Sequence, residues 1–404
     1  MAYKHGTYSE VGKTQAQSAI QAGSIPVYVG TAPVHLVRGY ASKGLVNEPV
    51  KLTQWGQAQQ AIGYAEDWTK YTLCEAMKVH LNNELGNAAP VYVINVLNPD
   101  THKATEQTTQ TLTFTNKRAE FVSNAIILDT FAIADKAEGE DYALDYDYAT
   151  SKVIVTDLKG TITTETATFS TVDPSKVTAT DIVGSVTANG EYSGIAALEL
   201  LYNKENQVAN YLVAPGWSHI PEVRNALVAA NQAMNGHWYS TSFTDIPISE
   251  AQTMAEAIAW KQENGYISAY EVPCFPMVQD NTGKVYHLST ISAWRQQLVD
   301  FEHDSIPAET ASNKAIPAVK LYFGESSTNK GYDKRRANDL NEKGIRTAVP
   351  SNGEMVLWGG HTGAYTYGST TDSAVIFDTN VFMRNHLLNW LQRRHDNAVD
   401  GIMN

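Results

Sequence analysis

A change of residue character at Asn98-Pro99-Asp100 most constrains what this chain can fold into. Before it, short β-branched runs alternate with helical segments. After it, residues 99–190 are rich in threonine and acidic residues, poor in helix formers and broken into short alternating runs. Alternation with a period of two is typical of half-buried strands. The sequence therefore predicts an all-β domain, a Thr-rich sandwich or barrel, inserted into a chain of another class.

The residues on either side of this insertion have the pattern of an α/β fold. Continuous β-branched runs, which suit strands covered on both faces, occur at 25–30 and 90–97. Downstream, strand and helix patterns alternate in βαβαβ order, which predicts a mostly parallel sheet with helices on both faces. The strands of that part are expected at 211–216, 237–243 and 267–272, and its helices at 221–234 and 249–263. The other expected elements are a strand at 33–37, helices at 55–66, 68–83 and 292–303, a strand at 355–358 and a long helix from 381 to about 395.

These patterns divide the chain into five expected parts. Residues 1–22 are polar and have no periodic apolar face that would fold alone, so we expect an extended N-terminal arm. The alternative is a disordered terminus. The other parts are an N-terminal α/β domain at 23–98, the β domain at 99–190, a larger α/β domain at 191–345 and a C-terminal domain at 346–404.

The net charge of −13 restricts the possible partners. An acidic surface repels phosphates, so direct nucleic-acid binding is disfavoured. The acidic excess is concentrated in residues 101–200, which hold 7 basic and 15 acidic side chains. No run of about 18 apolar residues and no signal-peptide pattern occurs, so we expect no membrane insertion. The two cysteines, Cys74 and Cys274, give no disulfide framework and fit a reducing compartment.

Motifs for catalysis and cofactor binding are missing from the sequence. Neither Gly-x-Ser-x-Gly nor a glycine-rich phosphate loop occurs, and no cofactor is predicted. Gly216-Trp217-Ser218-His219 comes nearest to a nucleophile elbow, which leaves an α/β hydrolase with a β accessory domain as an alternative function. Asp141, Asp145 and Asp147 suggest a calcium loop but lack its glycine and final glutamate, so a solvated strand is favoured and no metal site is predicted. A third interpretation is a carbohydrate-binding or adhesin-like module at 101–190.

Several short motifs stand in an order that resembles contractile phage-type tail sheath proteins. They are Tyr3-Lys4-His5-Gly6-Thr7-Tyr8-Ser9-Glu10, Ile25-Pro26-Val27-Tyr28-Val29-Gly30-Thr31-Ala32-Pro33, Val213-Ala214-Pro215-Gly216 and Leu357-Trp358-Gly359-Gly360-His361-Thr362. Together with the Thr-rich insertion, the resemblance covers essentially the whole chain. It implies a structural protein rather than an enzyme, with an α/β domain of subtilisin-like topology that is not catalytic.

The resemblance also implies partners. Proteins of this family form six-subunit rings stacked helically around an inner tail tube, meet baseplate and tail terminator proteins, and contract to drive the tube through a bacterial envelope. This implies a place in a virion tail, or in a phage-tail-like bacteriocin or injection particle, assembled in the bacterial cytoplasm. The ends of such subunits add strands to their neighbours, which implies that Tyr3, Thr7, Tyr8 and Val11 of the arm pair in this way.

The C-terminal region is expected to meet the tube. Relatives place basic residues of a C-terminal helix against an acidic tube, which implies that Arg384, Arg393 and Arg394 face the tube here. The alternative is that these are solvated helix charges. Relatives commonly continue beyond a stretch like Val399-Asp400-Gly401-Ile402-Met403, so we expect a truncated form with an incomplete C-terminal domain. The alternative is a variant that links its subunits differently.

Overall fold

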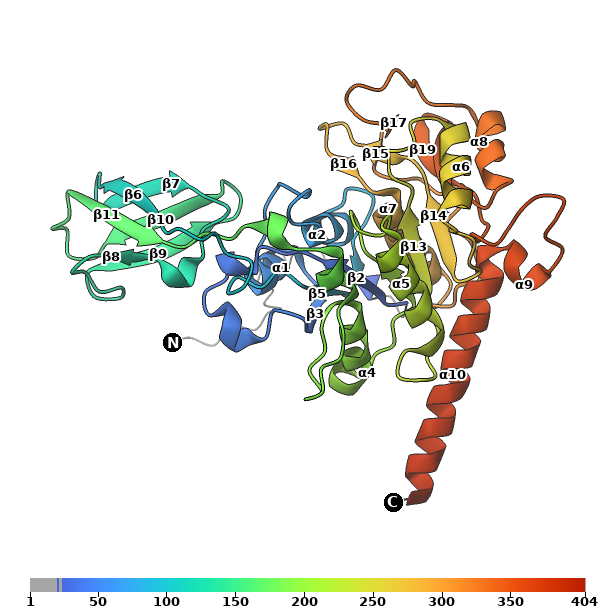
Figure 1. Cartoon of the computed structure of the whole chain (residues 1–404), viewed down its shortest axis with the longest axis horizontal. Coiled ribbons are helices and arrows are strands. Elements are labelled where there is room, and N and C mark those ends of the chain that lie inside the picture. The colour runs from blue at the N-terminus through green and yellow to red at the C-terminus, as the bar shows by residue number, and fades with distance from the viewer. Residues whose placement is uncertain (1–19, 22–23, 404) are drawn as a thin grey trace, which may run out of the picture.

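A six-stranded sheet forms the centre of the molecule in the computed structural model, which describes residues 20–21 and 24–403 (Figure 1). All neighbouring strands are parallel except β3, which runs antiparallel to β5 at one edge. Five of the six strands are buried along their whole length. In three of them, at 26–30, 91–95 and 211–213, the apolar sequence predicts this burial. In spatial order the strands are β14 (Glu271–Cys274), β13 (Thr241–Asp245), β12 (Tyr211–Val213), β2 (Pro26–Gly30), β5 (Val91–Asn95) and β3 (Pro49–Leu52).

This sheet joins two ranges that the sequence analysis treats as separate domains, 23–98 and 191–345. β2 pairs with β12, so that Val27 lies beside Leu212. One hydrophobic core contains side chains from both ranges, among them Tyr92 and Trp294. The two ranges therefore share one sheet and one core, because the insertion separates in sequence strands that pair in space.

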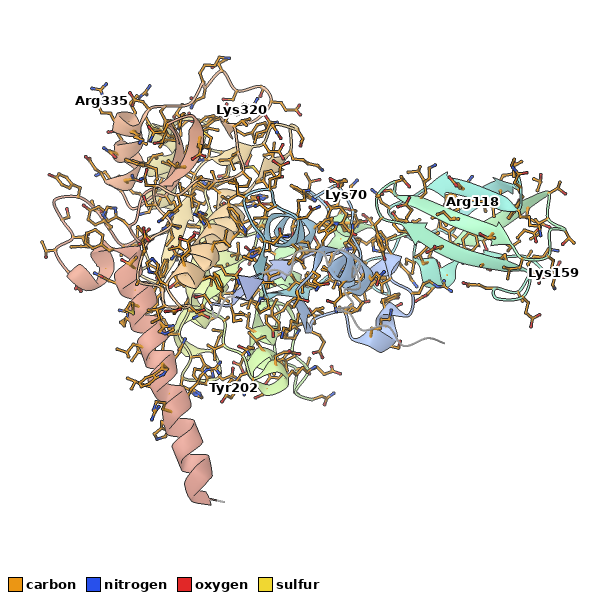
Figure 2. All side chains as sticks on the ribbon, turned by 180° about the vertical axis from the view of Figure 1, so that it is seen from behind. Lys70, Arg118, Lys159, Tyr202, Lys320 and Arg335 are labelled. Carbon is orange, nitrogen blue, oxygen red and sulfur yellow. The ribbon has the colours of Figure 1, made fainter. Side chains whose placement is uncertain are left out.

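Helices cover both faces of the sheet. α5 packs on β12 and β13, whereas α2 and α7 pack on each other and reach the sheet from the other side (Figures 1 and 2). α5 begins with Pro221 in its first turn, the favoured position for proline. α6 begins with a capping box of Thr253 and Glu256. The helices of this part are α1 (Trp55–Ile62), α2 (Leu73–Leu81), α3 (Ala179–Val183), α4 (Leu200–Glu205), α5 (Pro221–Ala233), α6 (Met254–Glu263) and α7 (Leu288–Glu302).

The strand expected at 33–37 is not formed. Val34–Leu36 is instead a short 3-10 turn, closed by the Leu36 amide donating to the Pro33 carbonyl at 3.0 Å. The His35 ring, buried in this turn, contacts the Asn124 carbonyl at 2.9 Å. Contacts with another part of the chain override the local preference for an extended backbone.

Residues 108–169 form two small antiparallel sheets that project from the body (Figure 1). They enclose a hydrophobic core of their own, which includes Phe131, Val153 and Phe169. Tyr148 connects this part to the body by donating to the Leu36 carbonyl at 3.0 Å. In spatial order the first sheet holds β7 (Arg118–Val122), β10 (Lys152–Asp157) and β9 (Tyr142–Asp147), and the second holds β6 (Thr108–Thr113), β11 (Thr164–Phe169) and β8 (Ala132–Ile133).

The remaining elements lie around the carboxyl-terminal half and end in a helix of 26 residues, α10 (Asp378–Met403). Figure 1 shows this helix leaving the body and pointing away from it.

At the amino-terminal end of the described chain, Ile20–Gln21 (β1) pairs in parallel with Ala88–Ala89 (β4). Within the described ranges, no helix is long and apolar enough to cross a membrane. The other elements are β15 (Met277–Gln279), β16 (Val285–Tyr286), β17 (Lys320–Tyr322), α8 (Lys334–Asn341), β18 (Thr347–Ser351), β19 (Glu354–Trp358) and α9 (Ser373–Ile376).

Candidate assembly surfaces

A buried ion pair holds the first turn of α10. The carboxylate of Asp378 pairs with the guanidinium of Arg346, and both side chains are fully buried. Thr310 donates a further hydrogen bond to Asp378 at 2.9 Å, and the Nε of Arg346 donates to the Gly359 carbonyl at 3.0 Å. Because charges removed from water need such additional partners, the pair fixes the position at which the helix begins.

Two asparagines and a phenylalanine then hold the helix along the body. The Nδ2 of Asn385 donates to the Ser240 carbonyl at 2.9 Å, and the Nδ2 of Asn389 donates to the Tyr239 carbonyl at 2.7 Å. Residues four apart lie on the same face of a helix, so both amides point to the same strand end. Phe382 packs edge-on against Tyr211, with ring centroids 5.3 Å apart. The helix is therefore docked from its start to Asn389.

Four apolar residues of α10 are exposed. The fractional exposures are 52% for Leu387, 36% for Leu388, 48% for Trp390 and 49% for Leu391. An exposed apolar patch of this kind marks an interaction site.

The three arginines expected to face a tube lie on this helix but not on one side of it. The Arg384 guanidinium lies 4.8 Å from the ring centroid of Tyr270. Arg393 donates to the Asn206 carbonyl at 3.4 Å. Both therefore contact the body of the molecule. Arg394 is exposed and stacks over the ring of Trp390 at 5.1 Å.

The residues expected to form the intersubunit arm, Tyr3, Thr7, Tyr8 and Val11, lie outside the described residues. The described chain begins with Ile20–Gln21, which already pairs with Ala88–Ala89.

The nearest match to a nucleophile elbow is a buried structural site. Ser218 is fully buried, and its Oγ accepts a hydrogen bond from the Asp245 amide at 3.0 Å. His287, the nearby histidine, directs its Nδ1 to Glu75 at 2.7 Å rather than to the serine. Ser218 thus has no access to solvent, and its hydroxyl bonds to Asp245 rather than to a histidine of the described chain, so the geometry gives the hydrolase alternative no nucleophile.

The Glu75 and His287 pair carries charge inside the protein. Burial by itself would lower the pKa of His287, but the carboxylates of Glu75 and Asp245 together raise it to about 9. Burial also raises the pKa of Asp245, which accepts a hydrogen bond from the Ser289 amide at 3.0 Å. This cluster connects α2, the end of β13 and the start of α7.

The aspartates considered as a calcium loop do not converge. Asp141 pairs with Lys159 at 2.7 Å, and Asp147 accepts from the Thr150 hydroxyl at 2.7 Å. In the part of the chain that the structure describes, no group of three or more histidine, cysteine or acidic side chains is placed to hold a metal ion.

Comparison with known proteins identifies similar chains. The chain is 30% identical over 367 residues to the tail sheath protein of Burkholderia phage BcepMu, in an alignment that covers 85% of this chain and 73% of the phage protein. Among solved structures, it is similar to the sheath tail protein of Desulfitobacterium hafniense, with a TM-score of 0.48, 11% identity, and coverage of 96% of this chain and 82% of that one. It is also similar to the PVC sheath of an extracellular contractile injection system in its contracted state. That comparison has a TM-score of 0.48 and 11% identity, and it covers 98% of this chain and 75% of the PVC chain. No protein-family model matches the chain.

Replacing Asp378 with alanine leaves Arg346 charged and buried without its partner. We expect the free energy of unfolding, measured by urea denaturation, to fall by about 3–5 kcal/mol. The exposed Glu342→Ala variant serves as the control and is expected to change it by less than about 0.5 kcal/mol. The double variant Arg346→Met/Asp378→Leu should recover most of the loss. A loss below about 1 kcal/mol for Asp378→Ala contradicts the anchoring role.

The raised pKa of His287 predicts a pH dependence of stability. A histidine that binds its proton more tightly in the folded state stabilises that state fully below its unfolded pKa, and this contribution is lost as the pH rises through the folded value, about 9. Between pH 6.5 and pH 10 we expect the wild type to lose up to about 3 kcal/mol more unfolding free energy than His287→Gln does. If the unfolding free energies of the two proteins change equally with pH, the charged pair of His287 and Glu75 is contradicted.

Proposed function

Because the chain belongs to the tail sheath protein family, we propose that it is the subunit of a contractile sheath, assembled as stacked six-membered rings around an inner tube. The observation that carries this proposal is the similarity to the Burkholderia phage tail sheath protein along most of both chains. Tail sheath proteins are structural, so the chain is a structural component of a phage tail or phage-tail-like particle and not an enzyme.

The proposed subunit uses its α/β body as a scaffold. We propose the subtilisin-like topology of the family for this body, and the buried Ser218 supports a purely structural use of it. In the proposed mechanism the extended sheath is metastable, and contraction releases energy stored during assembly as the surfaces between subunits become better matched. Baseplate and tail terminator proteins would bind at the two ends of the assembly.

The proposed arm comprises residues 1–22, with Tyr3, Thr7, Tyr8 and Val11 in the segment that adds a strand to a neighbouring subunit. An extended segment satisfies its backbone hydrogen bonds when it joins the edge of another sheet. The pairing of Ile20–Gln21 with β4 supports the proposal, because it attaches the carboxyl end of the arm to the body of its own subunit.

The proposed tube contact is the helix α10. Residues 379–395 contain Arg384, Arg393 and Arg394 and no aspartate or glutamate, so this stretch attracts an acidic partner. Arg394 is the most accessible of the three. Arg384 and Arg393 also pack against the body, so their replacement disturbs both the proposed contact and the docking of the helix.

Electron microscopy of the protein co-expressed with its tube protein tests the proposed assembly. We expect striated hollow cylinders with sixfold end views, and we expect deletion of residues 1–22 to abolish them while the circular dichroism of the α/β body is kept. Compact monomers from the full chain under the same conditions contradict the proposal. Cylinders formed by the deletion variant contradict only the proposed role of residues 1–22 in assembly.

Reversing the exposed arginine tests the tube contact. We expect Arg394→Glu to leave the melting temperature nearly unchanged, because the side chain is exposed, and to reduce the fraction of sheath that sediments with preformed tube by about ten-fold. Lys159→Glu, a charge reversal at an exposed position of the loop after β10, is the control (Figure 2). Equal co-sedimentation of Arg394→Glu and the wild type excludes the contact.

A further inference from the structure

The first described residues give the direction of the segment that precedes them. Ile20 lies beside Ala88 in a parallel pair of strands, and four residues later the Ser24 hydroxyl donates to Asp300 of α7 at 2.6 Å. Neighbouring parallel strands begin at the same end, so the segment before Ile20 is directed toward residues 82–87, which precede β4. It is therefore directed away from Asp300 and toward the end of α2.

A groove lies at the place toward which this segment is directed. It has a volume of about 380 Å³ and is bordered by residues 82–85 after α2, by the turn between β15 and β16, and by residues 316–319. Trp68 contributes to its apolar lining, and two further apolar lining residues, Leu85 and Val319, are 48% and 59% exposed. We call it the α2 groove. Exposed apolar side chains gathered in this way mark a surface that another segment covers.

The charges of the α2 groove are largely balanced by one another. Lys284 pairs with Glu66 at 2.5 Å. Asp280 accepts a hydrogen bond from the tyrosine hydroxyl of β16 at 2.8 Å. The other charged residues of the lining, Lys78 and Glu84, are of opposite sign. Because an added charge would lose its hydration without gaining a partner, such a groove favours an uncharged occupant.

The residues directly before Ile20 have this character. Residues 14–19, with the sequence Thr-Gln-Ala-Gln-Ser-Ala, carry no charge and no side chain larger than glutamine. Extending the register of Ile20 and Ala88 by three residues sets Gln17 beside Leu85. An extended segment of this length spans about 20 Å, so it reaches from the end of β1 past Leu85 and along the groove.

We propose that residues 14–19 lie in the α2 groove of their own subunit and cover Leu85 and Val319. The arm then leaves the body at the far end of the groove, and residues 1–11 remain free to pair with a neighbouring subunit. This inference rests on the arm of the proposed function, and it adds the place from which that arm leaves its own subunit.

Limited digestion of the free subunit with trypsin tests the docking. A protease needs an extended, accessible chain on both sides of the bond that it cuts, so docking of residues 14–19 protects the bond after Lys13 but not the bond after Lys4. We expect cleavage after Lys13 to be slower than cleavage after Lys4 by at least about ten-fold, relative to a synthetic peptide of residues 1–22. The same ratio of the two rates in the subunit and in the peptide overturns the docking.

Two variants show whether the α2 groove causes this protection. Val319→Asp places a carboxylate without a partner under the docked segment, so we expect cleavage after Lys13 to become as fast as in the peptide. Val122→Asp alters an exposed valine of β7 instead and should keep the protection. Protection that is the same in both variants overturns the docking.

Disulfide trapping distinguishes the subunit's own segment from that of a second copy. Both native cysteines are buried and unpaired. In Gln15→Cys/Val319→Cys we expect oxidation to join the two thiols within one chain, which stays a monomer on a non-reducing gel. The control Gln15→Cys/Phe301→Cys places the second thiol near the end of α7, next to Asp300 and away from the groove, and should stay unlinked. Covalent dimers or no link from the first variant, or equal links from both, overturn the docking.

These measurements use the free subunit, so they separate the inference from the sheath proposal. Cylinders formed by a protein whose bond after Lys13 is unprotected overturn the inference and leave the sheath proposal standing. A protected bond in a protein that forms no cylinders overturns the sheath proposal and leaves the docking of residues 14–19 standing.

Discussion

The pairing of β2 with β12 is the constraint on which the rest of the structure depends. It places Val27 beside Leu212 and so brings together two halves of the chain that the β insertion separates. The amide of Ile25 donates to the Asn210 side chain at 2.9 Å, and the Ser24 hydroxyl donates to Asp300 of α7 at 2.6 Å. Because both halves build one sheet and one core, the insertion must leave and return at the same side of the body, and it projects as a separate pair of sheets.

The same sheet determines where α10 lies. Phe382 packs against Tyr211 of β12, and Asn385 bonds to the backbone of Ser240 just before β13. The helix is therefore attached to the sheet by one face while its other face carries leucines in solvent. Exposed leucines on a well-anchored helix are unfavourable for an isolated subunit and favourable for one that is completed by a partner. This arrangement is expected of a subunit whose exposed apolar surface becomes buried on assembly.

The sequence predicted the elements whose signal is local. The buried strands at 26–30, 91–95 and 211–213 stand out as continuous apolar runs, and the helix after Pro221 is indicated by its first residue. The resemblance to tail sheath proteins, which came from the order of several weak motifs, is confirmed by the similarity to the phage protein.

What the sequence could not predict depends on contacts between distant residues. Arg346 and Asp378 carry no pattern that shows their pairing, and asparagines at 385 and 389 look like ordinary surface residues until their strand partners are known. Pairing across an insertion leaves no trace in composition, so the sequence does not show that the two α/β ranges build one sheet. The arginines at 384, 393 and 394 are close in sequence, but the helix turns two of them toward the body.

Hydrogen–deuterium exchange of α10 measures the central claim, that the outer face of this helix is buried only in the assembly. The amides of residues 387–395 are compared in the free subunit and in assembled cylinders, with the buried strand β2 as the internal reference. We predict that exchange in this segment slows by at least about ten-fold on assembly while exchange in β2 is unchanged. Equal exchange of the segment in the two states would contradict the account.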